Sequence, residues 1–119
     1  MGMNWDLLKT LYLRGDRASQ LNSLQLNLAR IRILATAHTD ELVALHLISE
    51  SQYFIEWIVP TLDLETDDIS VATSLVDLQR QLSRWKLEWG KCWSEEKARE
   101  DLAAQAEQWS AIKNLGRVD

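Results

Sequence analysis

The sequence predicts an all-α protein, an antiparallel bundle of four long helices preceded by a short N-terminal helix. The 119-residue chain has only four glycines and one proline, too few for the frequent turns of a β-sheet protein. Apolar residues recur at helical spacing along most of the chain, and short polar breaks separate these stretches. A chain of this length, 46% hydrophobic, is expected to form one domain over residues 1–119.

The first two helices are expected over residues 4–14 and 17–37. Gly15 is expected to end the first in a left-handed conformation, and Asp16 to cap the second. The apolar positions of the first helix are Trp5, Leu7, Leu8, Leu11 and Tyr12.

The helix expected over 17–37 carries apolar residues on two sides. A second stripe, formed by Leu26, Ile33 and Ala37, lies nearly opposite the main seam. A helix that is apolar on two sides must be covered on two sides. This helix is therefore predicted to be central in the bundle or shared with another subunit. The main seam consists of Leu21, Leu24, Leu28, Ile31 and Ala35.

A polar break follows at residues 38–41, where Thr39 is a good N-cap for the next helix. The third helix is expected over 40–59, ending before Pro60, which disfavours helical geometry in the residue that precedes it. Because neither glycine nor proline enforces the break, one long helix over 17–59 is the alternative.

The fourth helix is expected over 68–91, capped by Thr66 or Asp67. The acidic linker before it lacks the central glycine and terminal glutamate of an EF-hand loop, so its acids are interpreted as helix caps and not as calcium ligands. Apolar residues follow a 4-3 rhythm that predicts one buried seam: Val71, Leu75, Leu78, Leu82, Trp85, Trp89 and Cys92.

Gly90 and Ser94 mark the next break, and Ser94 is expected to cap a fifth helix over 94–115 that Gly116 ends. One face of this helix is apolar and is expected to join the core. It consists of Ala98, Leu102, Ala106, Trp109 and Ile112.

The segment RWKLEWGKCW, residues 84–93, contains three of the six tryptophans. On a helix, Trp85 and Trp89 fall on the leucine seam and point to the core. The basic residues fall on a flank with acids at i,i+3 and i,i+4, which indicates a solvated, charge-paired face. A platform for nucleic acid would need unpaired cations around exposed rings. The predicted pairs are Asp77/Arg80, Arg84/Glu88 and Glu88/Lys91.

Two residues near this segment are candidates for a second contact. Trp93 lies at the edge of the seam, where partial exposure is expected, and Leu87 points away from it. Together with Leu26 and Ile33 they form the candidate interface.

Net charge and motifs exclude several function classes. A charge of −5 argues against general binding to nucleic acid or to an anionic membrane. The single cysteine rules out an intrachain disulfide and fits a reducing cytoplasm. Neither a signal peptide nor a run of 18 apolar residues is present, so a cytoplasmic protein without a membrane span is expected. No metal or cofactor motif is present either.

Arg32 and His38 enclose the segment RILATAH, with five residues between them. This spacing resembles the Arg…His motif of the HEPN ribonucleases, small all-helical enzymes in which the pair faces a dimer cleft. The resemblance implies that Arg32 would hold a phosphate and His38 would move protons. The chain departs from the family by placing the pair in an early helix and by the apolar Ile33 after the arginine. Alternatively, Arg32 pairs with an acid and His38 helps to break the helix.

The preferred hypothesis is a cytoplasmic protein–protein interaction module that self-associates, as a homodimer, or binds another helical protein. It follows from the two-sided helix at 17–37 and from the absence of an assembled catalytic motif. The second hypothesis is the HEPN-like ribonuclease. The third is a small-molecule binder with a tryptophan-lined cavity between the helices at 40–59, 68–91 and 94–115.

Overall fold

A computed structural model describes residues 4–66 and 68–111 of the chain. Within these residues the chain forms six α-helices and one 3-10 turn, and no strand, which confirms the all-α class. The count differs from the predicted five helices because the helix expected over 68–91 is interrupted. The elements are α1 (Trp5–Arg14), α2 (Arg17–Ala37), α3 (Glu41–Ile58), η1 (Val59–Thr61), α4 (Asp68–Leu87), α5 (Trp89–Ser94) and α6 (Glu96–Ala111).

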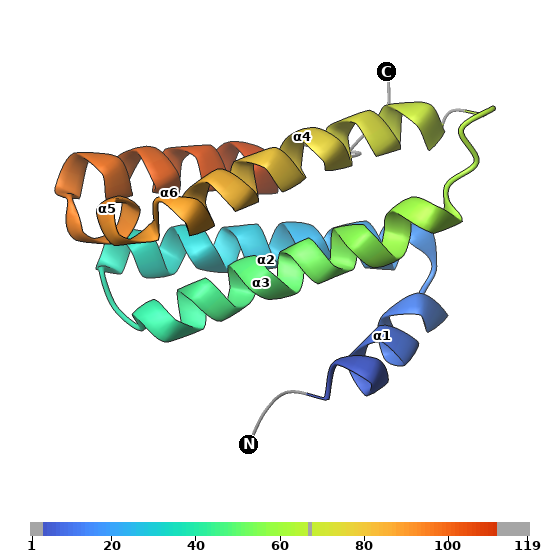
Figure 1. The fold of residues 1–119 in the computed structure, drawn as a ribbon, viewed down its shortest axis with the longest axis horizontal. Coiled ribbons are helices and arrows are strands. Elements are labelled where there is room, and N and C mark those ends of the chain that lie inside the picture. The colour runs from blue at the N-terminus through green and yellow to red at the C-terminus, as the bar shows by residue number, and fades with distance from the viewer. Residues whose placement is uncertain (1–3, 67, 112–119) are drawn as a thin grey trace.

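The four long helices α2, α3, α4 and α6 lie side by side and alternate in direction (Figure 1). In this view α4 passes in front of α6, and α3 in front of α2. The shortest dimension of the molecule is 20 Å, the thickness of two helix layers. The short helix α1 lies outside these layers, against α3.

The core is formed by the apolar seams that the sequence predicts. Leu24, Leu28 and Ile31 of α2 are fully buried, as are Leu75, Leu78 and Leu82 of α4. Burying a leucine or isoleucine side chain contributes about 1.5–3 kcal/mol relative to exposure. These seams therefore hold the two layers together.

The contact between α2 and α6 is the most extensive between any two helices. Small residues explain it, because Ala35 of α2 and Ala106 of α6 are fully buried and Ala103 is partly buried against the core. Alanine side chains allow two helix backbones to approach closely. The N-terminal half of α2 lies beside the C-terminal half of α6, where Gln25 Nε2 donates to the Trp109 carbonyl at 3.1 Å.

Aromatic rings attach α1 to the outside of α3. The Tyr12 ring stacks on Phe54, with centroids 3.9 Å apart and planes 6° apart, and Trp5 contacts Tyr53 at 4.3 Å. The Tyr12 hydroxyl donates to the Gln20 carbonyl of α2 at 2.7 Å. Burial of this phenol, and secondarily the negative charge of Glu50, raise the pKa of Tyr12 well above its ordinary value.

The junction between α1 and α2 confirms one of the two predictions made for it. Asp16 caps α2, since its Oδ1 accepts from the Ser19 amide at 2.8 Å, and this hydrogen bond lowers the pKa of the carboxyl. The left-handed conformation predicted for Gly15 is wrong, because its φ is −72° and its ψ 157°. The chain leaves α1 in an extended conformation that any residue adopts.

Two left-handed residues separate α2 from α3, so the single helix over 17–59 is wrong. His38 has φ 53° and Asp40 has φ 55°. The Thr39 amide donates back to the Leu34 carbonyl at 3.2 Å, which closes the last turn of α2. The N-cap predicted at Thr39 is therefore wrong: Thr39 is part of the turn, and Asp40 is the N-cap residue, without a side-chain capping bond.

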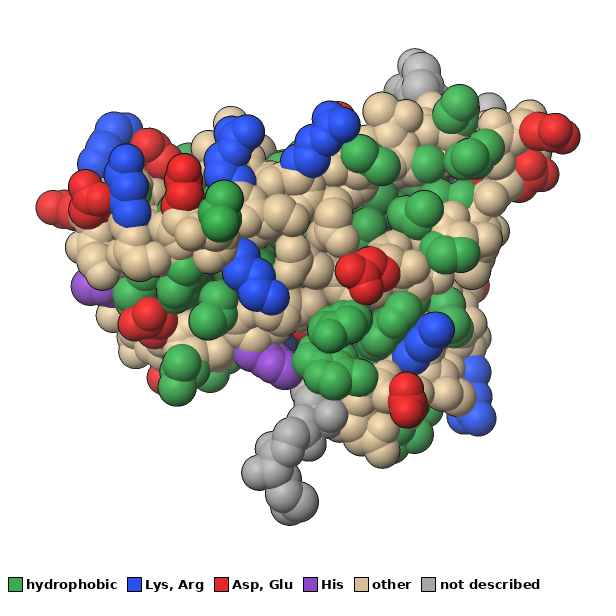
Figure 2. Space-filling view, viewed as in Figure 1, with side chains coloured by type: hydrophobic (Ala, Val, Ile, Leu, Met, Phe, Trp, Pro, Cys, Tyr) green, Lys and Arg blue, Asp and Glu red, His purple; other side chains and the backbone are tan. Residues whose placement is uncertain are grey.

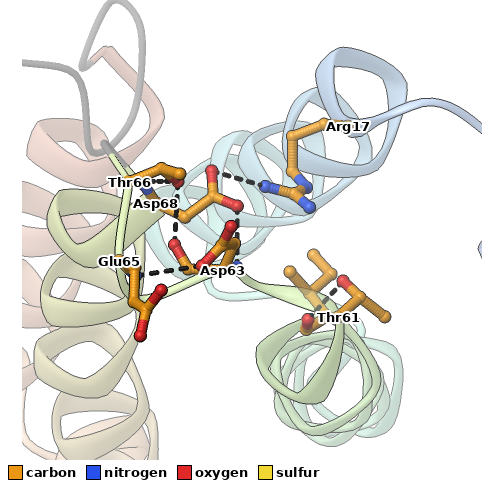
Figure 3. A network of polar contacts seen from close by, with 7 residues as sticks. Arg17, Thr61, Asp63, Glu65, Thr66 and Asp68 are labelled. Atoms are coloured by element: carbon orange, nitrogen blue, oxygen red, sulfur yellow. Dashed lines mark hydrogen bonds and ion pairs between the residues drawn. The ribbon is translucent and has the colours of Figure 1, made fainter.

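The linker between α3 and α4 is held by its own acids (Figure 3). Asp68 accepts from Arg17 Nη1 at 3.1 Å and, through its other oxygen, from the Asp63 amide at 3.0 Å. Thr66 Oγ1 accepts from the Asp68 amide at 3.3 Å, as predicted for a cap, whereas Asp67 lies outside the described residues. These contacts use the acidic run to fix the start of α4 relative to α2.

The break in the helix predicted over 68–91 falls at Glu88, which has φ −102° and ψ 23°. The predicted break at Gly90 is wrong, because Gly90 lies inside the short helix α5. Ser94 ends α5 and does not cap the helix that follows. Residues 112–116, including the predicted stop at Gly116, lie outside the described residues.

Tyr12→Phe is expected to make the free energy of unfolding fall less steeply with pH in alkaline solution. Because the pKa of Tyr12 is raised on folding, the folded protein holds the phenol proton above pH 10, where the unfolded chain releases it. The stability that this group contributes is complete below about pH 10 and is lost progressively as the pH rises above that value. Above pH ~10, the wild type should lose up to about 1.4 kcal/mol of unfolding free energy per pH unit that the variant does not lose. Urea denaturation followed by circular dichroism measures both slopes, and equal slopes would contradict the assignment.

Candidate interaction surface

The outer face of α2 carries two large apolar side chains. Leu26 is 55% exposed and Ile33 52% exposed. They lie two turns apart, on the side opposite the buried Leu24 and Leu28. The second apolar stripe predicted from the sequence thus exists, and no other helix of the described chain covers it.

The charges of α2 have a single sign. Its 21 residues include three arginines and no aspartate or glutamate. Arg17 pairs with Asp68 at 3.1 Å. Among the described residues, neither the exposed Arg30 nor the partly buried Arg32 forms an ion pair. The outer face of α2 is therefore apolar and cationic.

A groove of about 370 Å³ runs between α2 and α6. Its floor is formed by small side chains such as Ala35 and Ala103, and Arg32 lines it from α2. The wall on the α6 side carries three carboxylates that form no ion pair with described residues, Glu96, Glu100 and Glu107. This wall was not predicted from the sequence, in which the absence of acids from 17–37 shows that α2 is cationic but not which acids lie beside it.

His38 does not line this groove. Its exposed ring lies at the end of α2, 5.4 Å from the ring of Trp93. The described structure therefore does not bring Arg32 and His38, the two side chains that a HEPN-like reaction needs, into one groove.

Trp93 is buried, with 5% of its surface exposed, so the predicted partial exposure is wrong. Its ring stacks on Trp89 at 5.3 Å, and the break at Glu88 redirects α5 so that this pair packs onto the end of the bundle. Trp93 is thus a core residue and is removed from the candidate interface. Leu87 is 87% exposed and points away from the seam, as predicted.

The other two tryptophans of the segment face inward and use their ring N–H groups. Trp85 is buried, and its Nε1 donates to Gln105 Oε1 at 2.9 Å. Trp89 is partly buried, and its Nε1 donates to Glu41 Oε2 at 3.0 Å. These hydrogen bonds connect α4 to α6 and α5 to α3.

A second groove, of about 400 Å³, lies between α4, α5 and α6. Of the tryptophans only Trp85 lines it, and the rim is charged, so it is not the tryptophan-lined cavity that the sequence suggested. Cys92 also lines it, and burial, followed by the charge of Glu88, raises the pKa of this thiol. The un-ionised thiol is a poor nucleophile.

Charged residues of both signs mix on the surface where α4 meets α5 (Figure 2). Of the three predicted pairs, Asp77 and Arg80 form an ion pair at 3.6 Å, whereas Glu88 forms none with Arg84 or Lys91 because α4 ends just before it. Exposed pairs of this kind contribute little to stability. This surface is a solvated face.

Among the residues that the structure describes, no three histidine, cysteine, aspartate or glutamate side chains lie close enough together to hold a metal ion. In the same part of the chain, no helix is both long and apolar enough to cross a membrane. Comparison with models of known protein families, with curated proteins and with solved structures finds no match for this chain.

Replacing Trp93 and Leu87 separately by alanine distinguishes the core residue from the surface residue. Trp93→Ala should lower the free energy of unfolding by about 3–5 kcal/mol because it leaves a cavity beside Trp89. Leu87→Ala should change it by less than about 0.5 kcal/mol, because the side chain is already in water. Urea denaturation followed by circular dichroism measures both values. A small loss for Trp93→Ala would show that its ring is not buried.

Proposed function

We propose that this protein is a cytoplasmic interaction module that self-associates as a homodimer through the outer face of α2. The observation that supports this proposal is the half-exposure of Leu26 and Ile33 on one stripe of a helix whose opposite side is fully buried. Aligned apolar residues on an otherwise polar surface are typical of contact sites, whereas isolated ones are common on any protein.

Leu87 is a weaker candidate for the contact. It is the last residue of α4, and the residues one and two turns before it are polar or charged, namely Ser83, Arg84 and Arg80. A single exposed leucine in such surroundings buries little surface against a partner. Leu87 therefore serves as a matched control for the α2 stripe.

Apolar burial alone does not account for a tight dimer. Covering the exposed halves of Leu26 and Ile33 in both copies contributes roughly 3–6 kcal/mol. A micromolar dimer needs about 8 kcal/mol after the entropic cost of association is met. The interface must therefore include further contacts, and Arg30 and Arg32, which form no ion pair with described residues, are available for them.

A charge introduced into the stripe should dissociate the dimer. Leu26→Glu and Ile33→Glu each place a carboxylate in the buried part of the contact, so the mass measured by light scattering after size exclusion should fall from dimer to monomer at micromolar concentration. Leu87→Glu should remain dimeric. Circular dichroism verifies that all three variants are folded. A wild-type protein that is monomeric throughout, or a dimer that only Leu87→Glu dissociates, would contradict the proposal.

A further inference from the structure

We infer that a second copy of the chain binds with its α2 lying antiparallel over α6 of the first, and the reverse, about a two-fold axis that runs along the α2–α6 groove. The inference rests on the proposed self-association and specifies its geometry. Its basis is the match between the cationic α2 and the carboxylates that line the neighbouring edge of α6.

The two helices carry complementary surfaces. α2 presents Arg30 on its exposed side and Arg32 at the groove, neither in an ion pair with a described residue, and no acid. The edge of α6 beside the groove presents three carboxylates that form no ion pair with described residues, and one arginine, Arg99, whose Nη1 donates to the Trp93 carbonyl at 2.8 Å. A helix with protruding apolar side chains and arginines is complementary, in shape and in charge, to a surface of small side chains and carboxylates. The residues of this edge are Glu96, Arg99, Glu100, Ala103, Ala104 and Glu107.

The arrangement of α2 and α6 makes this contact reciprocal. The two helices are neighbours and run antiparallel in one copy. A two-fold axis parallel to them exchanges their positions, so each α2 lies antiparallel on the partner's α6. The same contact then occurs twice in the dimer, once for the α2 of each copy, so its contribution to the free energy of association is counted twice.

The hydrogen bond between Gln25 and Trp109 shows which residues of α2 and α6 lie at the same height along the helix axes. One turn further along both, Ala29 lies level with Gln105, next to Ala104. A two-fold axis parallel to the helices preserves these levels. Ala29 of one copy therefore faces Ala104 of the other.

The competing geometry places α2 on α2. Pairing Leu26 with Ile33 of a second copy buries both side chains, but it centres the contact on residues 29 and 30. Arg30, which lies beside the stripe, then meets Arg30 of the second copy on a helix that has no acid to neutralise them. Like charges brought together in an interface oppose association. The distribution of charge therefore favours α2 on α6.

Disulfide trapping distinguishes the two geometries. Cys92, the only cysteine, is replaced by alanine, and Ala29→Cys and Ala104→Cys are made separately on that background. One variant is labelled with ¹⁵N, the two are mixed in equal amounts and oxidised mildly, and mass spectrometry counts the three crosslinked species. The mixed 29–104 species should exceed the 29–29 species at least ~tenfold, because only this pair is held at high effective concentration. Circular dichroism of the reduced variants, and light scattering of the Cys92→Ala parent, verify folding and self-association.

Each outcome of the trapping experiment has one meaning. A dominant 29–104 species supports the inferred geometry. A dominant 29–29 species shows α2 on α2 and overturns the inference, while the proposed function stands. A dimeric parent without either crosslink also overturns the inference alone. A parent that remains monomeric at micromolar concentration overturns both the inference and the proposed self-association.

Discussion

The fold depends on the contact that the buried stripe of α2 makes with the other helices. Leu24, Leu28 and Ile31 are inaccessible to water, and the two most extensive helix contacts are those of α2 with α6 and with α3. Alanines allow α6 to approach closely, and larger side chains fill the space toward α3 and α4. If α2 were displaced, α3 and α6 would both lose their most extensive packing contact.

Polar contacts fix the alignment that apolar packing leaves open. Asn27 Nδ2 donates to Glu50 Oε1 at 3.1 Å and to Ser51 Oγ at 3.3 Å, and the Ser51 hydroxyl donates to the Leu47 carbonyl at 2.7 Å. A slip of α3 along α2 would leave the buried Asn27 amide without partners, at a cost of about 1–3 kcal/mol. With its inner face so occupied, α2 has Arg30, Arg32 and its outer apolar residues available for other contacts.

The seams on α2 and α4 could be predicted from the sequence because a heptad-like rhythm over many residues leaves one helical solution. Local turns could not. Glu88 breaks a helix without glycine or proline, and the gain that explains this break is tertiary, namely the packing of Trp93 on Trp89 and against His38. The exposed stripe at Leu26 and Ile33 was readable from spacing, but the carboxylates facing Arg32 were not, because only the folded pairing of α2 with α6 brings them together.

The central claim is that α2 serves two contacts, one within the chain and one between copies. Its most direct test is the urea midpoint of unfolding at protein concentrations about a hundredfold apart, since a dimer gains stability by mass action and a monomer does not. The midpoint is predicted to rise with concentration in the wild type. A midpoint independent of concentration across the micromolar range would contradict the claim and leave the outer face of α2 as ordinary surface.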